Sequence, residues 1–343
     1  MIRWFAIGAV VLLVLAGSGA AYQGLRYMNQ SLAIEEPVLY ELVAGTPFSL
    51  LVKDLKQRGW LESALAMRLH ARLDESATRV QAGQYLLEPG ITAPQLLQKM
   101  VAGDVHLLSL TIVEGWRFSD MKARLMAEAG LKQDVDWAKP LWPQLGIDKP
   151  LADNPEGQFY PDTYRFPEGQ AVSRLLRQSY ERLRQVLDQA WAKRRSDLPL
   201  KSPYEALILA SIVEKETGQA AERPQIAGVF VRRLERGMRL QTDPTIIYGL
   251  GQNFDGNLRR RHLKDSTNPY NSYRHHGLPP SPIALVGRAA IEAAVQPKDG
   301  DSLYFVARGD GSHYFSATLA EHEAAVRKFQ IEKRRSDYRS APK

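Results

Sequence analysis

The 343-residue sequence contains no cysteine. This absence excludes a disulfide framework, a thiolate nucleophile and a cysteine-ligated metal, and it leaves no side chain to carry a lipoprotein lipid. The sequence also has no HExxH helix and no two histidines four residues apart, so neither a metal nor a cofactor is expected. His275 and His276 are adjacent, and in an extended loop such neighbours point apart, which favours loop or sugar-contacting roles.

Zinc-finger spacing, RNA-stacking aromatic motifs, internal repeats and low-complexity tracts are missing as well, so no nucleic-acid partner is expected. The composition, with 44% hydrophobic and 24% charged residues, is that of a folded globular protein. The formal net charge of +7 is mild for this length and fits an anionic partner such as lipid headgroups or an acidic cell-wall polymer.

The N-terminus carries the longest apolar run. After Arg3, 22 uncharged residues follow before Arg26, against the roughly 20 that span a bilayer core. Trp4 and Tyr22 lie where interfacial aromatics are usual, which favours an uncleaved transmembrane anchor over residues 1–26. A cleaved signal peptide is the alternative, because small residues follow the apolar stretch. Either reading takes the rest of the chain out of the cytoplasm.

Downstream, hydrophobic spacing predicts an α+β protein with two parts. After a linker at 27–37, residues 38–105 read as strand, helix, helix, strand and helix, the last with Thr92 as N-cap and Gly103 after its end. Residues 106–333 read as a larger mixed α/β domain, and 334–343 as a basic, disordered tail. In the larger domain we expect a helix capped by Ser119, a long helix near 171–195, a β-hairpin in "LYFVARGDGSHYFSAT" and a final helix near Ala320.

One apolar helix carries two glutamates in "ILASIVEKETG". Ser202 is its expected N-cap, with a proline at the first position and Glu205 three residues after the cap, and Gly218 is its stop. At about 100° per residue, Glu216 falls on the face of the large apolar residues and Glu214 falls almost opposite. The spacing therefore points Glu216 toward the core and Glu214 toward solvent or a supporting role.

A carboxyl group at the inner end of an apolar face has a raised pKa, as a general acid at neutral pH requires. The competing interpretation is a structural ion pair, and its possible partners near in sequence are Arg223, Arg232 and Arg233. The sequence of this helix alone favours that structural pair.

Two later stretches are rich in amides, hydroxyls and aromatics. "LQTDPTIIYG" contains Gln241, Thr242 and Asp243, and "STNPYNSYRHHGLPPSPI" contains Asn271 and Tyr273 on a loop framed by proline and glycine. Such groups hydrogen-bond sugar hydroxyls and acetamido groups and stack on pyranose rings, which indicates a glycan-binding cleft. The aromatics of "FYPDTYRFP" are predicted to pack within the protein.

Taken together, "LASIVEKET", "RLQTDPTIIYG", "YNSYRHHGLPPSPI", "VEGWRFSD" and "FYPDTYRFP" resemble the MltG/YceG-like endolytic murein transglycosylases over essentially the whole chain. The resemblance implies cleavage of the MurNAc–GlcNAc β-1,4 bond of nascent glycan strands without water, leaving 1,6-anhydro-MurNAc ends. It implies Glu216 as the catalytic residue, on a lysozyme-like active-site helix, and a LysM-like subdomain at 38–105.

The resemblance further implies a single-pass protein of the bacterial inner membrane, with the catalytic domain on the periplasmic side, beside the cell-wall synthesis machinery. Glycan contacts are then expected from Gln241, Thr242, Asp243, Asn271 and Tyr273. Glu214 and Glu222 are possible supporting residues, although Glu222 reads more simply as solvated and Asp243 equally well as a helix cap or turn residue.

Two other functions stay open from the sequence. A hydrolytic muramidase on the same fold would need a second carboxylate to activate water, from Asp243 or Glu222. A non-catalytic wall-binding scaffold would have no need of the intact "EKET" motif.

Overall fold

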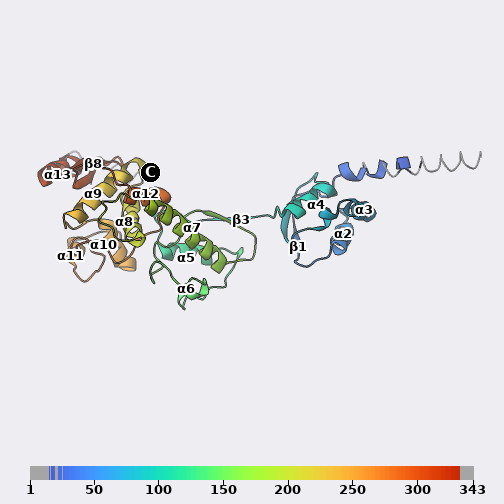
Figure 1. The fold of residues 1–343 in the computed structure, drawn as a ribbon, viewed down its shortest axis with the longest axis horizontal. Coiled ribbons are helices and arrows are strands. Elements are labelled where there is room, and N and C mark those ends of the chain that lie inside the picture. Colours follow the sequence, from blue (N-terminus) through green and yellow to red (C-terminus); the bar gives the residue numbers. More distant parts are fainter. Residues whose placement is uncertain (1–14, 16, 20–21, 25, 333–343) are drawn as a thin grey trace, which may run out of the picture. The chain divides into compact units, whose positions relative to one another are not determined.

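The computed structural model describes residues 15, 17–19, 22–24 and 26–332 (Figure 1). The fold is mixed α+β, mostly helical, with small two-stranded sheets. Among the described residues, no helix is both long enough and apolar enough to cross a membrane. Most of the predicted anchor at 1–26 and all of the tail at 334–343 lie outside the described residues. The chain divides into two units, residues 1–108 with 165–168, and residues 109–164 with 169–343.

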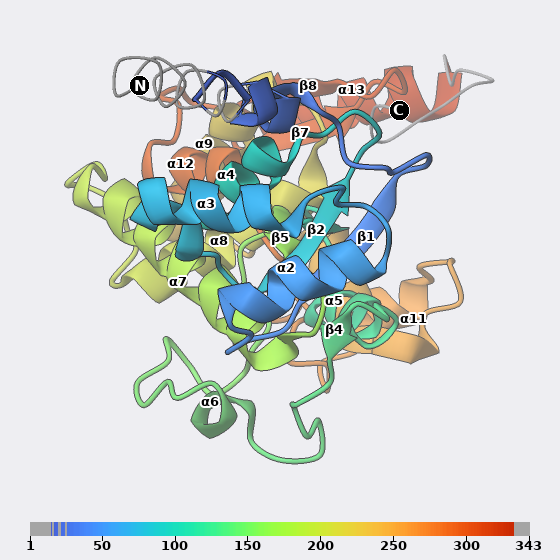
Figure 2. The same ribbon diagram turned by 90° about the vertical axis from the view of Figure 1, so that its right-hand side faces the viewer.

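The first unit builds one core from three helices and a short β-ribbon. Its elements are β1 (Val38–Leu42), α2 (Phe48–Gln57), α3 (Ala64–Leu73), the 3₁₀ turn Glu75–Thr78, β2 (Gly83–Leu87) and α4 (Ala93–Ala102). The strands pair antiparallel, with Tyr40 opposite Tyr85 in the core. Figure 2 shows α2 and α3 beside this strand pair.

The predicted ends of α4 are confirmed. Thr92 and Gln95 form a reciprocal capping box, and Gly103 ends the helix in the left-handed conformation, at φ 67°. Glycine adopts that conformation without strain, so it is the usual residue at this position.

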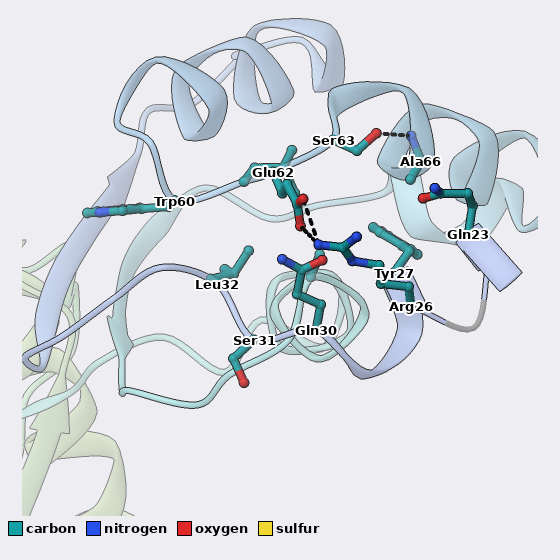
Figure 3. Close-up of a pocket in the computed structure, with 12 residues that line it drawn as sticks. Gln23, Arg26, Tyr27, Gln30, Ser31, Leu32, Trp60, Glu62, Ser63 and Ala66 are labelled. Carbon is teal, nitrogen blue, oxygen red and sulfur yellow. Dashed lines mark hydrogen bonds and ion pairs between the residues drawn. The ribbon is translucent and has the colours of Figure 1, made fainter.

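The segment 27–37, predicted as a linker, contributes to the core of the first unit. Leu32 and Ile34 are buried in it, and the backbone N–H of Leu32 donates to the carbonyl of Ile91 at 2.8 Å. Just before this segment, Arg26 donates to both carboxylate oxygens of Glu62, at 2.9 and 3.1 Å. These two residues line a cavity of about 180 Å³ (Figure 3).

The second unit is mainly helical. Its early elements are β3 (Leu108–Thr111), which begins one residue before the division, α5 (Phe118–Met126), β4 (Leu131–Lys132), α6 (Leu141–Gln144), β5 (Thr163–Phe166), β6 (Gln170–Ala171) and α7 (Val172–Ala192). Its later elements are α8 (Pro203–Glu216), α9 (Arg223–Glu235), α10 (Asp243–Leu250), α11 (Arg260–Lys264), α12 (Arg288–Val295), β7 (Tyr304–Ala307), β8 (His313–Ser316), α13 (Leu319–Val326) and the π-helical turn η4 (Arg327–Glu332). β3 pairs with β5, β4 with β6, and β7 with β8.

Helix α8 forms the centre of this unit. It packs against α7, α9, α10 and α12, and every residue from Ala206 to Val213 is buried. The predicted N-cap is confirmed, since the Ser202 hydroxyl accepts from the N–H of Glu205. The Glu205 carboxylate accepts from the N–H of Lys201 instead of closing a capping box. A helix buried on all sides carries its terminal side chains into protein surroundings whichever way they point.

Three further predictions have definite outcomes. The hairpin is confirmed, because β7 and β8 pair antiparallel with Tyr304 opposite Ser316. The Ser119 cap is wrong, because α5 begins at Phe118, and the N–H of Arg117 donates to Asp120 at 2.9 Å. The aromatics of "FYPDTYRFP" are packed as predicted, with Phe159, Tyr164 and Phe166 all buried.

Candidate active site

The last turn of α8 presents the carboxyl group of Glu216 to two later segments of the chain. The hydroxyl of Thr242 donates a hydrogen bond to its Oε1. The residue keeps partial contact with solvent, but its carboxyl group is enclosed by protein atoms. This burial raises the pKa of Glu216 to about 7, against a lowering effect of the Thr242 hydrogen bond. A large fraction of Glu216 is therefore protonated at neutral pH.

Thr242 occupies the N-cap position of α10, yet its hydroxyl does not cap that helix. The hydroxyl is directed at Glu216, while the backbone of Thr242 is held by Ser272. The N–H of Thr242 donates to Ser272 Oγ at 2.9 Å, and Ser272 Oγ lies 2.9 Å from Thr245 Oγ1. All three hydroxyl residues are buried, so they fix one position for the group that contacts the acid.

The structure brings Asp243 and Tyr273 to the same place. The Tyr273 hydroxyl donates to Asp243 Oδ1 at 2.8 Å. The charge of Asp243 adds to the raised pKa of Glu216, and burial followed by the charges of Asp243 and Glu216 raises the pKa of Tyr273. Asp243 is exposed and is the first residue of α10, so it is reachable from solvent beside the acid.

Two of the predicted glycan-contacting residues have different surroundings. Gln241 is exposed and is the one non-glycine among the described residues with a positive φ, 51°. Asn271 is fully buried, and its amide donates to the carbonyls of His262, Leu263 and Asp265. Asn271 therefore holds the loop that carries Ser272 and Tyr273, and it presents no free group to a ligand.

Glu214 is buried, so of the two expectations for it, a solvated residue and a supporting residue, the solvated one is wrong. Its side chain is only 4% exposed, and Oε1 lies 2.8 Å from the guanidinium of Arg223. Oε2 accepts from the N–H of Gly287 at 3.1 Å. A Cβ at residue 287 would lie 1.8 Å from Glu114 Oε1, so a larger residue there would displace the Glu114 carboxylate. The structural ion pair that the sequence offered for Glu216 belongs to Glu214.

Burial raises the pKa of Glu214, and Arg223 opposes that shift. At Glu216 the charge of Arg233 has only a small lowering effect on the pKa. Arg233 is itself buried and donates its Nε hydrogen to the carbonyl of Leu303 at 2.6 Å. No ion pair to Glu216 is formed within the described part of the chain.

Glu222 is not solvated, contrary to the simpler expectation. Oε1 accepts from the backbone N–H of His313 at 2.9 Å, and Oε2 lies 2.7 Å from His313 Nδ1. The Thr217 hydroxyl, next to Glu216 in the chain, also donates to Oε2 at 3.4 Å. Glu222 thus links the end of α8 to strand β8 through hydrogen bonds, and its position is a supporting one.

The sequence reasoning missed Glu156, a second carboxyl with a pKa raised by burial to about 7. It is 5% exposed. Oε1 accepts from the N–H of Phe118 at 2.9 Å, and Oε2 accepts from the hydroxyl of Tyr248 at 3.2 Å. No sequence signal singles it out, because an acid in a loop is normally solvated. Its two oxygens are occupied, so it braces α10 against the start of α5.

No group of three or more metal-ligating side chains exists among the residues that the structure describes. The rings of His275 and His276 contact the carbonyls of Asn268 and Gly237, respectively.

Comparison with known proteins places this arrangement in context. The YceG-like family profile matches residues 40–328. A protein of Bacillus subtilis (strain 168), named endolytic murein transglycosylase, is 28% identical, with 83% of each chain covered. A Streptococcus pneumoniae serotype 2 protein of the same name is also 28% identical, over 95% of this chain and 65% of its own. A crystal structure of a YceG-like protein from Listeria monocytogenes superposes with a TM-score of 0.53 at 28% identity, over 85% of this chain and 99% of its own.

Proposed function

The chain belongs to the YceG-like family, and from that premise we propose that it is an endolytic lytic transglycosylase of peptidoglycan. Its substrate would be the MurNAc–GlcNAc β-1,4 bond of nascent glycan strands, and its action would limit strand elongation. The observation that carries the proposal is the enclosed Glu216 carboxyl, with a pKa raised to about 7, which accepts from a hydroxyl and has no ion-pair partner among the described residues. The names of the two relatives support the substrate class.

In the proposed reaction Glu216 acts first as the acid. It donates its proton to the glycosidic oxygen, the C1–O4 bond breaks, and the GlcNAc unit leaves with a free 4-hydroxyl. The MurNAc C1 passes through an oxocarbenium-like state. The C6 hydroxyl of the same sugar then bonds to C1 while Glu216, now a carboxylate, takes its proton. One carboxyl group is sufficient because neither water nor an enzyme nucleophile takes part.

The residues around Glu216 would orient the sugar. Thr242, Asp243 and Tyr273 lie nearest to the acid through the contacts described above. Gln241 is exposed beside them. Asn271 would act indirectly by holding their loop, since its amide is buried.

The location of the protein is also a proposal. The apolar run at 1–26 would anchor the chain once in the bacterial inner membrane, with the catalytic domain in the periplasm beside the cell-wall synthesis machinery. Residues 38–105 would form the LysM-like subdomain.

Hydrolysis is the second candidate, and Asp243 is the observation that favours it. Glu222 is occupied by His313, whereas Asp243 is exposed and close enough to raise the pKa of Glu216. A carboxylate in that position could activate water.

Mass spectrometry of glycan fragments tests the two candidates. Nascent, uncross-linked strands are digested with the full-length protein, and the masses of the fragments with new MurNAc ends are measured. We expect 1,6-anhydro ends, which are lighter by one water than reducing ends. Reducing ends would establish hydrolysis, and a failure to release any fragments would refute both.

A further inference from the structure

A cavity of about 410 Å³ lies in the second unit. It is formed by the start of α9 and by the β7–β8 hairpin, and its lining includes Glu222, Gln225, Arg308, Ser312, His313 and Tyr314. The volume lies within the range of about 300 to 1,000 Å³ that is usual for small-ligand sites. The cavity is connected to the candidate active site through Glu222, which accepts from Thr217, the residue after Glu216.

Two largely buried side chains of the lining, Glu222 and His313, already bind each other. The His313 side chain is 5% exposed and that of Glu222 is 13% exposed. Because His313 contacts Glu222 through both its backbone and its ring, the acid has little capacity left for a ligand. The two residues therefore form one wall of the cavity and hold each other in place.

Arg308 is the arginine in the lining of this cavity, and its positive charge is accessible to a ligand. Its side chain is exposed, and the guanidinium carbon lies 5.6 Å from the Tyr314 ring centre and 6.0 Å from that of Phe329. In the described part of the chain, no carboxylate forms an ion pair with Arg308. The cavity of the first unit differs, because there Arg26 already binds both oxygens of Glu62 (Figure 3).

An arginine held over aromatic rings keeps its planar fork of donors directed outward, which suits a carboxylate. Peptidoglycan carries such groups, since the lactyl ether of MurNAc is extended by a short acidic peptide. We propose that the cavity between α9 and the β7–β8 hairpin binds a carboxylate of the peptide stem, with Arg308 as the residue that recognises it. This inference rests on the proposed function, and it makes the enzyme favour glycan that bears stems.

The test compares two substrates and four proteins. The substrates are uncross-linked strands with their stems and the same strands after an amidase has removed the stems. The proteins are the full-length wild type, Arg308→Ala, Arg308→Lys and, as a matched control, Arg174→Ala, which removes an exposed arginine of α7.

For wild type we expect KM on stem-bearing strands to be about ten-fold lower than on stripped strands, as one charge-assisted hydrogen bond would give. Arg308→Ala should raise KM on stem-bearing strands about ten-fold, leave kcat unchanged and have no effect on stripped strands. Arg308→Lys should fall between, and Arg174→Ala should match wild type. An equal effect on both substrates, or none on either, would overturn the inference while leaving the proposed function intact.

A binding measurement separates the two hypotheses further. Free stem peptide is titrated into wild type and into Arg308→Ala, with each folded state checked by circular dichroism. Weaker binding to the variant supports the inference, and identical binding contradicts it. If wild type cleaves neither substrate, the proposed function fails and this titration alone decides whether the cavity takes the peptide.

Discussion

Glu214 and Glu216 lie two residues apart at the end of one buried helix, in opposite electrostatic surroundings. Glu214 is held by the guanidinium of Arg223 at 2.8 Å and by a backbone N–H. Glu216 is held by a threonine hydroxyl and lies near the negative charge of Asp243. Burial raises the pKa of both carboxyl groups, and the partner group then separates an acid suited to structure from one suited to proton transfer. A cation favours the carboxylate, while burial and a nearby negative charge favour the protonated form, and at Glu216 they outweigh the hydrogen bond from Thr242.

The largest effect expected from this contrast is on activity. Glu216→Gln keeps the size of the side chain and an acceptor for Thr242, but it removes the transferable proton. We expect the rate of glycan cleavage to fall about 10²- to 10⁴-fold, the usual contribution of a general acid. Release of anhydro-ended fragments measures the rate.

Glu214→Gln is the matched control for that experiment, since it makes the same substitution two residues away. Its activity per folded molecule should fall far less. If the two variants lost activity equally, the division of roles between the glutamates would be wrong.

The second effect is on stability, and here Glu214 is the residue whose substitution matters. Glu214→Gln leaves the guanidinium of Arg223 buried, with Glu114 at 3.6 Å as its remaining carboxylate. Removing one partner of a buried ion pair typically costs 3–5 kcal/mol, so we expect the free energy of unfolding to fall by about 3 kcal/mol. Urea denaturation measures it.

Glu292→Gln is the control for stability, because it breaks an exposed pair with Arg288 on the surface of α12. Exposed pairs contribute at most about 1 kcal/mol, so this variant should change little. If Glu214→Gln and Glu292→Gln lowered the free energy of unfolding by similar amounts, burial of the Arg223–Glu214 pair would contribute nothing beyond an exposed pair.

The smallest effect is on the pH dependence of cleavage. The acid must be protonated, so the rate should fall as pH rises through the pKa of Glu216, about 7. Thr242→Val removes a hydrogen bond that lowers this pKa, so the alkaline limb should move to higher pH. Asp243→Asn removes a negative charge that raises the pKa, so the limb should move to lower pH. Each shift corresponds to a few-fold change in rate at a fixed pH.

Glu156 provides the control for the pH profile, because its pKa is also raised to about 7. In Glu156→Gln the limb should stay at its wild-type position. Movement of the limb in that variant, or shifts of Thr242→Val and Asp243→Asn in the same direction, would assign the titration to another group.

Elements of the fold were predictable where a few residues close together in the sequence determine them. The caps at Thr92, Gly103 and Ser202 and the β7–β8 hairpin follow from a few neighbouring residues, and the structure has all of them. The Ser119 cap failed because a second acceptor, Asp120, competes for the same helix start.

The candidate site was predictable only in part. Helix spacing correctly predicted that Glu216 points inward. It wrongly predicted an exposed side for Glu214, because hydrophobic spacing always gives a helix a more polar face, even when protein covers the helix on every side. Besides Arg223, Glu214 binds the N–H of Gly287, 73 residues away in sequence, and Glu222 binds His313, 91 residues away. Such pairings depend on tertiary packing, which one sequence does not specify locally. The catalytic role of Glu216 stays a prediction.

The hydrogen bond between Thr242 and Glu216 also has a consequence for folding. It joins residues 26 apart in sequence, and Thr242 is in turn held by Ser272, another 30 residues on. Contacts that close long loops form late. Until those segments pack, Glu216 is an ordinary solvated glutamate with a pKa near 4.5. A chain still being synthesised therefore lacks the raised pKa at Glu216, and the candidate acid is complete only when the second unit has finished folding.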